Sequence, residues 1–481
     1  MDFFIFKSFI EAETAMLLSV FIIAFVMGLF VNKTNFCTMG AVSDVINIGD
    51  TGRLRAWFFA IAIAILGVGV LEYYNLLDPS STFPPYRNSN IAIFENLLGG
   101  LMFGVGMTLA SGCGNKTLVR IGGGNIKSII VFVIVGAIAY YMVNPLPGTD
   151  QTIYSYLFYS WTNDLSAVAT TTQDLGSIFG GEEPATTKLL FSIIIALLIL
   201  VYAFKSKDFR TLDNILGGLV VGVAVVLAWF MSASYTVQPD PETPDDQYKL
   251  IEYYQDWDML ADNSRTKPAA GTPLSTQSFS FINPMGQTIN YVYNVGAEVL
   301  GVGLSDYNKE KIKNSAEQFK MLSEEYDVCL SESESEEEKL ECTKPYKAVF
   351  EMNNLLTFGV VAVFGVILGS FLWSLVSRSF RVEWFSSLKD VYSHVIGAIL
   401  MGIGGTLAMG CTIGQAVSGV STLAIGSILT FAAIFFGSAL TMKTQYYKMV
   451  YDAEATYLAC FVTGMVDLKL LPESFRKLEK V

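Results

Sequence analysis

The sequence has little of what gives a soluble enzyme its surface and its chemistry. Only 16% of its 481 residues are charged, against about 25% in a typical soluble protein. It has one histidine, His394, too few for a histidine-based metal site or a catalytic triad. It has no Cys-x-x-Cys pair and no phosphate loop ending in Gly-Lys-Ser/Thr, the signatures of thioredoxin-like redox sites and ATP motors. We therefore expect no enzymatic activity, no cofactor and no bound metal.

Apolar residues, in contrast, are abundant. They make up 52% of the chain, and 41 glycines suit close helix–helix approach in lipid. A bilayer core needs about 20 apolar residues per helix. The candidate spans are Ala15–Val31, Ala56–Tyr73, Ile91–Leu109, Ile126–Val143, Leu189–Ala203, Asn214–Phe230, Leu355–Val376, Val391–Ala408 and Ile425–Thr441. The sequence thus predicts an all-α polytopic membrane protein with about nine transmembrane helices. We interpret a shorter apolar stretch at Tyr457–Val466 as an interfacial segment.

The basic residues of the short loops predict the orientation. With nine spans, they all fall on one side: Arg53, Arg55, Arg120, Lys127, Lys205, Lys207, Arg210, Arg378, Arg381, Lys389, Lys469, Arg476, Lys477 and Lys480. The long loops Asn144–Lys188 and Met231–Asn354 fall on the other side and are acidic or neutral. Because basic loops stay in the cytoplasm, we expect a multi-pass protein of the cytoplasmic (inner) membrane, with the N-terminus outside and the C-terminus inside.

Acidic residues outweigh basic ones overall. The net charge of −13 makes nucleic acid an improbable partner. Much of it sits in the run SESESEEEKLE, which we interpret as a solvated loop. Two cysteines beside the run, Cys329 and Cys342, could pair if the loop faces an oxidising compartment.

The chain contains an internal repeat. GGLMFGVGMTLASGC at Gly99–Cys113 aligns without gaps to GAILMGIGGTLAMGC at Gly397–Cys411, and NFCTMG at Asn35–Gly40 corresponds more weakly to FINPMG at Phe281–Gly286. Each half then reads as four helices interrupted by two polar re-entrant turns, and the halves have opposite topology. Inverted repeats with broken helices are typical of transporters, whose site lies between the repeats at mid-membrane.

The repeat also suggests how the chain divides. We predict a first repeat in residues 1–143, an extracytoplasmic loop with a connecting helix in 144–213, a second repeat in 214–442 with an acidic extracytoplasmic insertion at 231–354, and a cytoplasmic tail in 443–481.

Three cysteines occupy the predicted turns: Cys37, Cys113 and Cys411. A buried cysteine is often a small apolar packing residue. The presence of a cysteine in each of three predicted turns nevertheless favours a functional role. A thiol is a weak donor and a soft partner, suited to a ligand that presents sulfur. Backbone N–H groups at broken helices attract anions, and Lys33, Lys116 and Arg120 add positive charge nearby. Together these features indicate a sulfur-containing anion.

At these motifs the sequence resembles the YeeE/YedE membrane proteins, whose matching segments form a sulfur-transport domain. The resemblance rests on NFCTMGAVSDVINIGD at Asn35–Asp50, ASGCGNKTLVRIGGGN at Ala110–Asn125 and LAMGCTIGQ at Leu407–Gln415. It implies uptake of thiosulfate or a related reduced sulfur species through S–H···S contacts along a row of cysteines. It also implies a TusA-like sulfur-carrier protein as the cytosolic partner.

We therefore expect an importer in which the anion passes Cys411 beneath Ser275–Gly286, then Cys113, and leaves past Cys37. Lys33 and Lys116 would ease its exit, and the expected oxyanion donors are Asn115, Thr117, Thr412 and Gln415. Two alternatives stay open. One is a membrane sulfur-transferase that takes sulfur as a cysteine persulfide and hands it to a cytosolic carrier. The other is a general small-anion or selenium-compound channel in which the cysteines only pack.

Overall fold

The structure is a computed structural model, and it describes residues 4–7, 9–162, 166–169, 172–180, 184–238, 247–255, 275–300 and 356–479. The acidic run, Cys329 and Cys342 lie outside these residues. Within them, nine helices are long and apolar enough to cross a membrane, which confirms the predicted number. They are α1 (Phe9–Thr34), α3 (Gly52–Tyr73), α4 (Ile93–Leu109), α6 (Ile126–Val143), α10 (Pro184–Phe204), α11 (Leu212–Ser234), α16 (Phe358–Val376), α17 (Leu388–Leu407) and α18 (Ile425–Tyr451).

Shorter elements fill the breaks and cover the ends of the bundle. Beside the breaks lie α2 (Thr38–Ser43), the π-helical turn η1 (Asp44–Ile48), α5 (Gly114–Gly122), α13 (Ile282–Leu300) and the π-helical turn η5 (Ile413–Gly419). In the loops and at the ends lie η2 (Pro79–Ser81), α7 (Ile153–Leu157), α8 (Tyr159–Thr162), α9 (Leu175–Phe179), α12 (Leu250–Gln255), η6 (Asp452–Glu454), α19 (Tyr457–Asp467) and η7 (Glu473–Phe475). The strands are β1 (Phe4–Phe6), β2 (Asn90–Ile91), β3 (Ala167–Val168), β4 (Tyr235–Val237) and β5 (Tyr248–Lys249).

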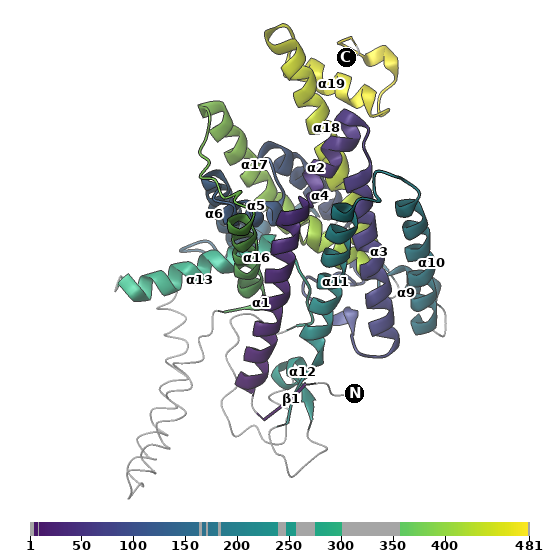
Figure 1. Cartoon of the computed structure of the whole chain (residues 1–481), viewed down its shortest axis with the longest axis vertical. Helices are drawn as coiled ribbons and strands as arrows, with labels where there is room; N and C mark the ends of the chain where they lie inside the picture. Colours follow the sequence, from purple (N-terminus) through teal and green to yellow (C-terminus); the bar gives the residue numbers. More distant parts are fainter. Residues whose placement is uncertain are drawn as a thin grey trace, which may run out of the picture.

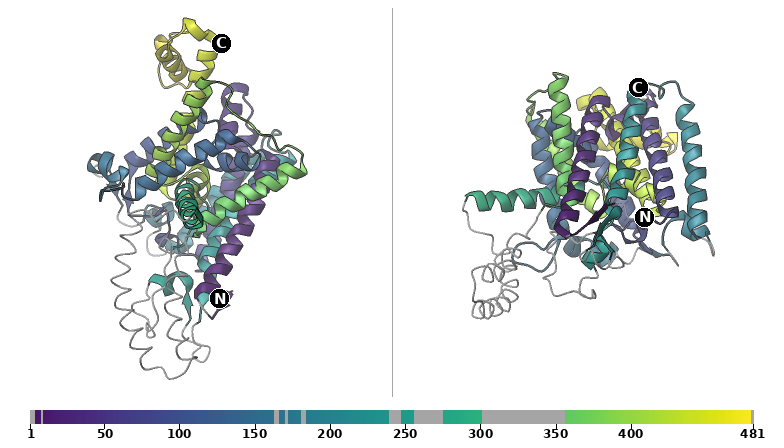
Figure 2. Two further views of the ribbon diagram at one scale, coloured as in Figure 1. Left: turned by 90° about the vertical axis from the view of Figure 1, so that its left-hand side faces the viewer. Right: turned by 60° about the horizontal axis from the view of Figure 1, so that its bottom comes forward.

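The long helices run side by side, and α13 extends sideways out of the bundle that they form (Figures 1 and 2). The sequence suggested only a short re-entrant turn at Phe281–Gly286, whereas the structure starts this 19-residue helix at Ile282. The patch interpreted as interfacial forms α19, which packs against α18 beyond the bundle (Figure 1).

The two halves pack in the same pattern. Helix α1 packs against α16 as α11 packs against α3, and α4 packs against α18 as α17 packs against α6. The breaks follow the same rule, because α5 contacts α16 and α6 whereas η5 contacts α3 and α18. This exchange of equivalent partners is what a twofold relation between repeats produces. Helix α10 lies outside the pattern: it packs on α3, and Leu190, Leu198 and Val201 are more than half exposed, as expected of a lipid-facing surface.

The repeats are inverted with respect to each other. Strand β1 directly precedes α1 and pairs in parallel with β4, which directly follows α11. The start of α1 and the end of α11 therefore lie at the same end of the bundle, so the two equivalent helices run in opposite directions. The N-terminus lies at this end and the C-terminus at the other (Figure 1), as an odd number of spans requires.

Glycines bring α4 and α17 together where the repeats meet. A Cβ added at Gly106 would lie 2.6 Å from the Gly397 oxygen, and one at Gly404 would lie 2.6 Å from the Gly99 oxygen. The mirrored contacts place the start of each helix beside the end of the other. These glycines therefore serve close helix packing, which the abundance of glycine in the sequence indicated.

Candidate functional site

Several helices end in a left-handed turn, and in three of them, α1, α4 and α17, the turn leads directly to a cysteine. One or two residues past the helix end, each turn has a residue with a left-handed backbone: Asn35 (φ 49°), Ser111 (φ 60°) and Met409 (φ 56°). The next N–H then bonds back to a carbonyl five residues earlier. These bonds are Phe36 N to Val31 O at 3.2 Å, Gly112 N to Met107 O at 2.8 Å and Gly410 N to Gly405 O at 2.8 Å. Such turns stop a helix while satisfying its last carbonyls, so the chain can break inside the membrane.

The cysteines start the next helical segments. Cys37 and Cys113 are the residues immediately before α2 and α5, and Cys411 lies two residues before η5. The Cys37 thiol accepts a hydrogen bond from the Gly40 N–H at 3.4 Å, and the Cys411 thiol accepts one from the Gly414 N–H at 3.4 Å. All three thiols are free and buried. Each sulfur is thus held near backbone N–H groups, where an anion is favoured.

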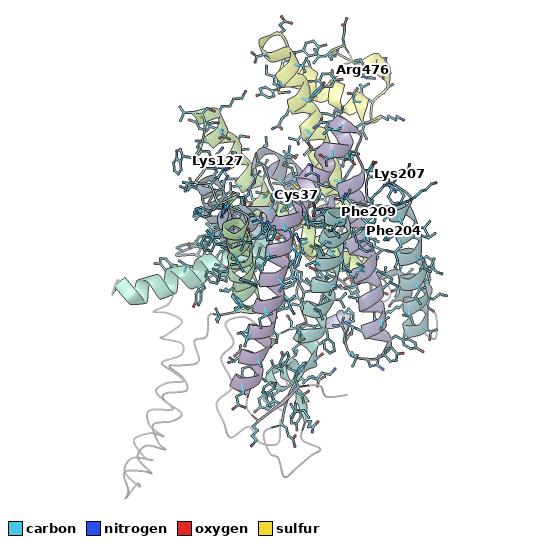
Figure 3. The ribbon with its side chains drawn as sticks, viewed as in Figure 1. Cys37, Lys127, Phe204, Lys207, Phe209 and Arg476 are labelled. Carbon is cyan, nitrogen blue, oxygen red and sulfur yellow. The ribbon has the colours of Figure 1, made fainter. Side chains whose placement is uncertain are left out.

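The three turns meet in the middle of the molecule. The Thr38 hydroxyl, next to Cys37, donates to the Cys113 sulfur at 4.0 Å. A Cβ added at Gly114, next to Cys113, would lie 3.7 Å from the Cβ of Cys411. Cys113 is within electrostatic range of Cys37, and Cys411 of Cys113. Cys113 is therefore the common neighbour of the other two cysteines. Cys37 lies on the C-terminal side of the bundle (Figure 3).

The predicted oxyanion donors are all buried, but their hydrogen bonding differs. Among the described residues, the side-chain oxygens of Asn115 and Gln415 have no hydrogen-bond partner, whereas the Thr412 hydroxyl lies beside the Cys113 thiol, within reach of a side-chain hydrogen bond. The Gln415 amide nitrogen donates to the Ala408 carbonyl. Thr117 donates its hydroxyl to the Cys113 carbonyl at 3.1 Å, so its proton is already used within its own helix. A buried polar atom without a partner is costly, which makes Asn115 and Gln415 the stronger candidates for ligand contact.

The two predicted lysines lie in different surroundings. Lys116 is half-buried and within electrostatic range of both Cys37 and Cys113. The Lys33 ammonium lies over the rings of Phe30 and Trp373, at 5.7 and 5.4 Å from their centroids. Lys116 is thus beside the thiols, whereas Lys33 is held by aromatic rings.

The segment before α13 covers the Cys411 turn. A Cβ added at Gly114 would lie 3.6 Å from the Phe281 Cβ, and one at Gly414 would lie 2.5 Å from the Ser280 hydroxyl. The Ser418 hydroxyl donates to the Phe279 carbonyl at 2.7 Å. The segment that the sequence predicts to lie over Cys411 therefore contacts the Cys411 turn.

Sequence reasoning missed Thr38 as a member of the site. Its signal was present, because a hydroxyl directly follows the cysteine in NFCTMG. The covering segment was anticipated as a whole, but nothing local indicated which of its serines touch η5.

Comparisons with known proteins identify the family of the chain. The family model described as sulphur transport matches residues 33–240 and 340–440. A thiosulfate transporter, TsuA, of Escherichia coli (strain K12) is 28% identical over 143 residues, covering 30% of this chain and 39% of the relative. A TsuA thiosulfate transporter of Spirochaeta thermophila is 22% identical over 191 residues, covering 39% of this chain and 53% of the relative. The matches thus span about two fifths and about half of these relatives. Because the family model covers well over half of the chain and includes all three cysteine turns, the resemblance to the YeeE/YedE proteins is confirmed, and the chain belongs to the sulphur transport family.

Proposed function

We propose that this membrane protein imports thiosulfate, or a closely related reduced sulfur anion, through a pathway lined by Cys411, Cys113 and Cys37. The anion meets Cys411 beneath the segment 275–286, passes Cys113 and leaves past Cys37 and Lys116. The names of the two relatives support this substrate. The protein acts as a transporter and not as an enzyme.

The observation that carries the proposal is that the turns bearing the three buried thiols contact one another. The Thr38–Cys113 hydrogen bond and the contact between Gly114 and Cys411 link turns from opposite ends of the chain. Several weak sites in a row suit conduction, which needs binding that is favourable enough to admit an ion and loose enough to release it. Weak thiol donors beside backbone N–H groups supply that kind of binding.

The orientation follows from the same charges as in the sequence. Lys127, Lys207 and Arg476 lie on the C-terminal side of the bundle (Figure 3), which we assign to the cytoplasm. The N-terminus then lies outside the inner membrane. A TusA-like sulfur carrier is the partner that we propose on the inner side, and Lys33 is a candidate contact near the exit.

Uptake of sulfur-labelled thiosulfate into proteoliposomes tests the proposal. Wild type is compared with Cys37→Ala, Cys113→Ala and Cys411→Ala. Cys460→Ala is the matched control, because Cys460 is also free and buried but packs with Tyr447 and Ala455 in the C-terminal region. We expect the three site variants to lose most uptake and the control to keep it, with little inhibition by excess sulfate.

The outcome separates the rival functions. Uptake that survives all three substitutions, and that sulfate or chloride inhibits equally, would indicate a general anion channel with packing cysteines. Absent uptake together with an extra sulfur on a site cysteine would indicate a sulfur-transferase.

A further inference from the structure

A tyrosine from a distant loop lies beside the Cys411 turn. Tyr86 belongs to the connection between α3 and α4, outside the cysteine motifs, yet its side chain is only 3% exposed. It lies within electrostatic range of Cys411, and its ring packs edge-on against Trp229 with the centroids 6.2 Å apart. In the described part of the chain its hydroxyl has no hydrogen-bond partner.

The loop that carries Tyr86 is fastened by its neighbour Arg87. The Arg87 guanidinium donates to both carboxylate oxygens of Glu72, at 2.6 and 2.8 Å, and to the Thr422 carbonyl at 3.0 Å. Lys188 binds the same Glu72 carboxylate at 3.0 Å. Arg87 is 3% exposed, and a buried bidentate pair of this kind fixes geometry well. Because Thr422 follows η5, the clamp ties the Tyr86 loop to the chain leading from Cys411.

Trp229 holds the other side of the tyrosine. Its indole N–H donates to the Ser421 hydroxyl at 3.3 Å, which fixes the ring against which Tyr86 packs. The Tyr86 hydroxyl is therefore positioned from two directions without a bond of its own. A buried phenol that lacks a partner loses its hydration without compensation. Such an arrangement is expected where a bound group completes the hydrogen bond.

We propose that the Tyr86 hydroxyl donates a hydrogen bond to an oxygen of the anion held at Cys411, and so helps to select the substrate on the outer side of the pathway. The inference rests on the proposed function and deepens it. Cys411 contacts the sulfur end of the anion, whereas the unpartnered Tyr86 hydroxyl contacts the oxygen end. Arg87 is a positioning residue that holds the loop.

The test is Tyr86→Phe, which removes only the hydroxyl and keeps the ring against Trp229. Tyr74→Phe is the matched control, because Tyr74 lies just after α3 and is 67% exposed. Initial uptake rates are measured over a range of thiosulfate concentrations in proteoliposomes. A hydrogen bond to a charged ligand corresponds to about a tenfold change in affinity. We expect KM of Tyr86→Phe to rise about tenfold with Vmax within about twofold, and the control to match wild type.

A binding measurement complements the kinetics. Thiosulfate should raise the Tm of the detergent-purified wild type and of Tyr74→Phe, and should raise that of Tyr86→Phe less at the same concentration. This readout does not depend on reconstitution.

The outcomes distinguish this inference from the proposed function. If Tyr86→Phe keeps the wild-type KM and Tm shift while Cys411→Ala loses uptake, the hydroxyl serves only a bound water. The inference is then overturned and the transporter stands. If the wild-type protein neither takes up thiosulfate nor is stabilised by it, thiosulfate is not the substrate. The proposed role of Tyr86 is then refuted together with the proposed function.

Discussion

Substitution of Gly106 or Gly404 by alanine tests the crossing of α4 and α17 on which the site depends. A Cβ at Gly106 would lie 2.6 Å from the Gly397 oxygen and 2.7 Å from the Met401 nitrogen. At Gly404 the nearest atoms are the Gly99 oxygen and the Phe103 nitrogen, both at 2.6 Å. All four atoms belong to the backbone, so no side chain can turn away, and the helices themselves must move apart.

The size of the effect follows from these contacts. Ordinary van der Waals contact begins near 3.4 Å, so each substitution requires a separation of roughly 0.8 Å. Overpacking of this kind costs about 3 kcal/mol, the upper end of its usual range, because backbone must shift. The better helix propensity of alanine returns about 1 kcal/mol. The net loss is about 2 kcal/mol for each variant, or a fall in Tm of about 2 °C for a chain of this length.

The assay is thermal unfolding of the purified protein in detergent, followed by tryptophan fluorescence. Gly464→Ala is the control, because its new Cβ would lie 3.3 Å from the Lys443 Cβ and at least 3.6 Å from every other neighbour, and we expect its Tm to stay near that of wild type. The double variant Gly106→Ala/Gly404→Ala should lose less than the sum of the single variants, since one separation accommodates both methyl groups. Two single variants as stable as the control would refute the close crossing.

Three further predictions concern the clamp and the thiols. Burial alone would raise the pKa of Asp174, but Arg87 and the Thr172 hydroxyl outweigh it and hold the pKa below its usual range. The stabilisation is therefore present above about pH 4 and fades as pH falls through the folded pKa, so Asp174→Asn should flatten the acid side of a plot of Tm against pH. Thr38→Val, which removes the donor to Cys113, should lower uptake about two- to fivefold while Thr38→Ser retains it. Intact-mass spectrometry after thiosulfate turnover should find all three site thiols unmodified, and a stable extra sulfur would contradict permeation.

The sequence predicts those features that short stretches of chain encode. Nine spans follow from apolar length alone, and the break after Ala110 or Ala408 follows from the repeated A-x-G-C motif. Tyr86 could not be placed in this way. Its position beside Cys411 depends on the ion pair of Arg87 with Glu72 and on Trp229, three elements that no local pattern connects. Helix α13 was missed for a different reason: its mixture of polar and aromatic residues lacks the long apolar stretch that marks a span.

The repeat leaves an asymmetry that gives the proposed pathway a direction. Cys113 and Cys411 are equivalent positions, but Cys37 corresponds to Asn283, and Lys116 corresponds to Gly414. In the proposed pathway, the inner half therefore has two thiols and a half-buried cation, whereas the outer half has one thiol and the nearby hydroxyl of Tyr86. An anion that presents both oxygen and sulfur would first be selected through its oxygens. It would then pass to the thiols and the positive charge near the exit, where the sequence places the cytoplasm.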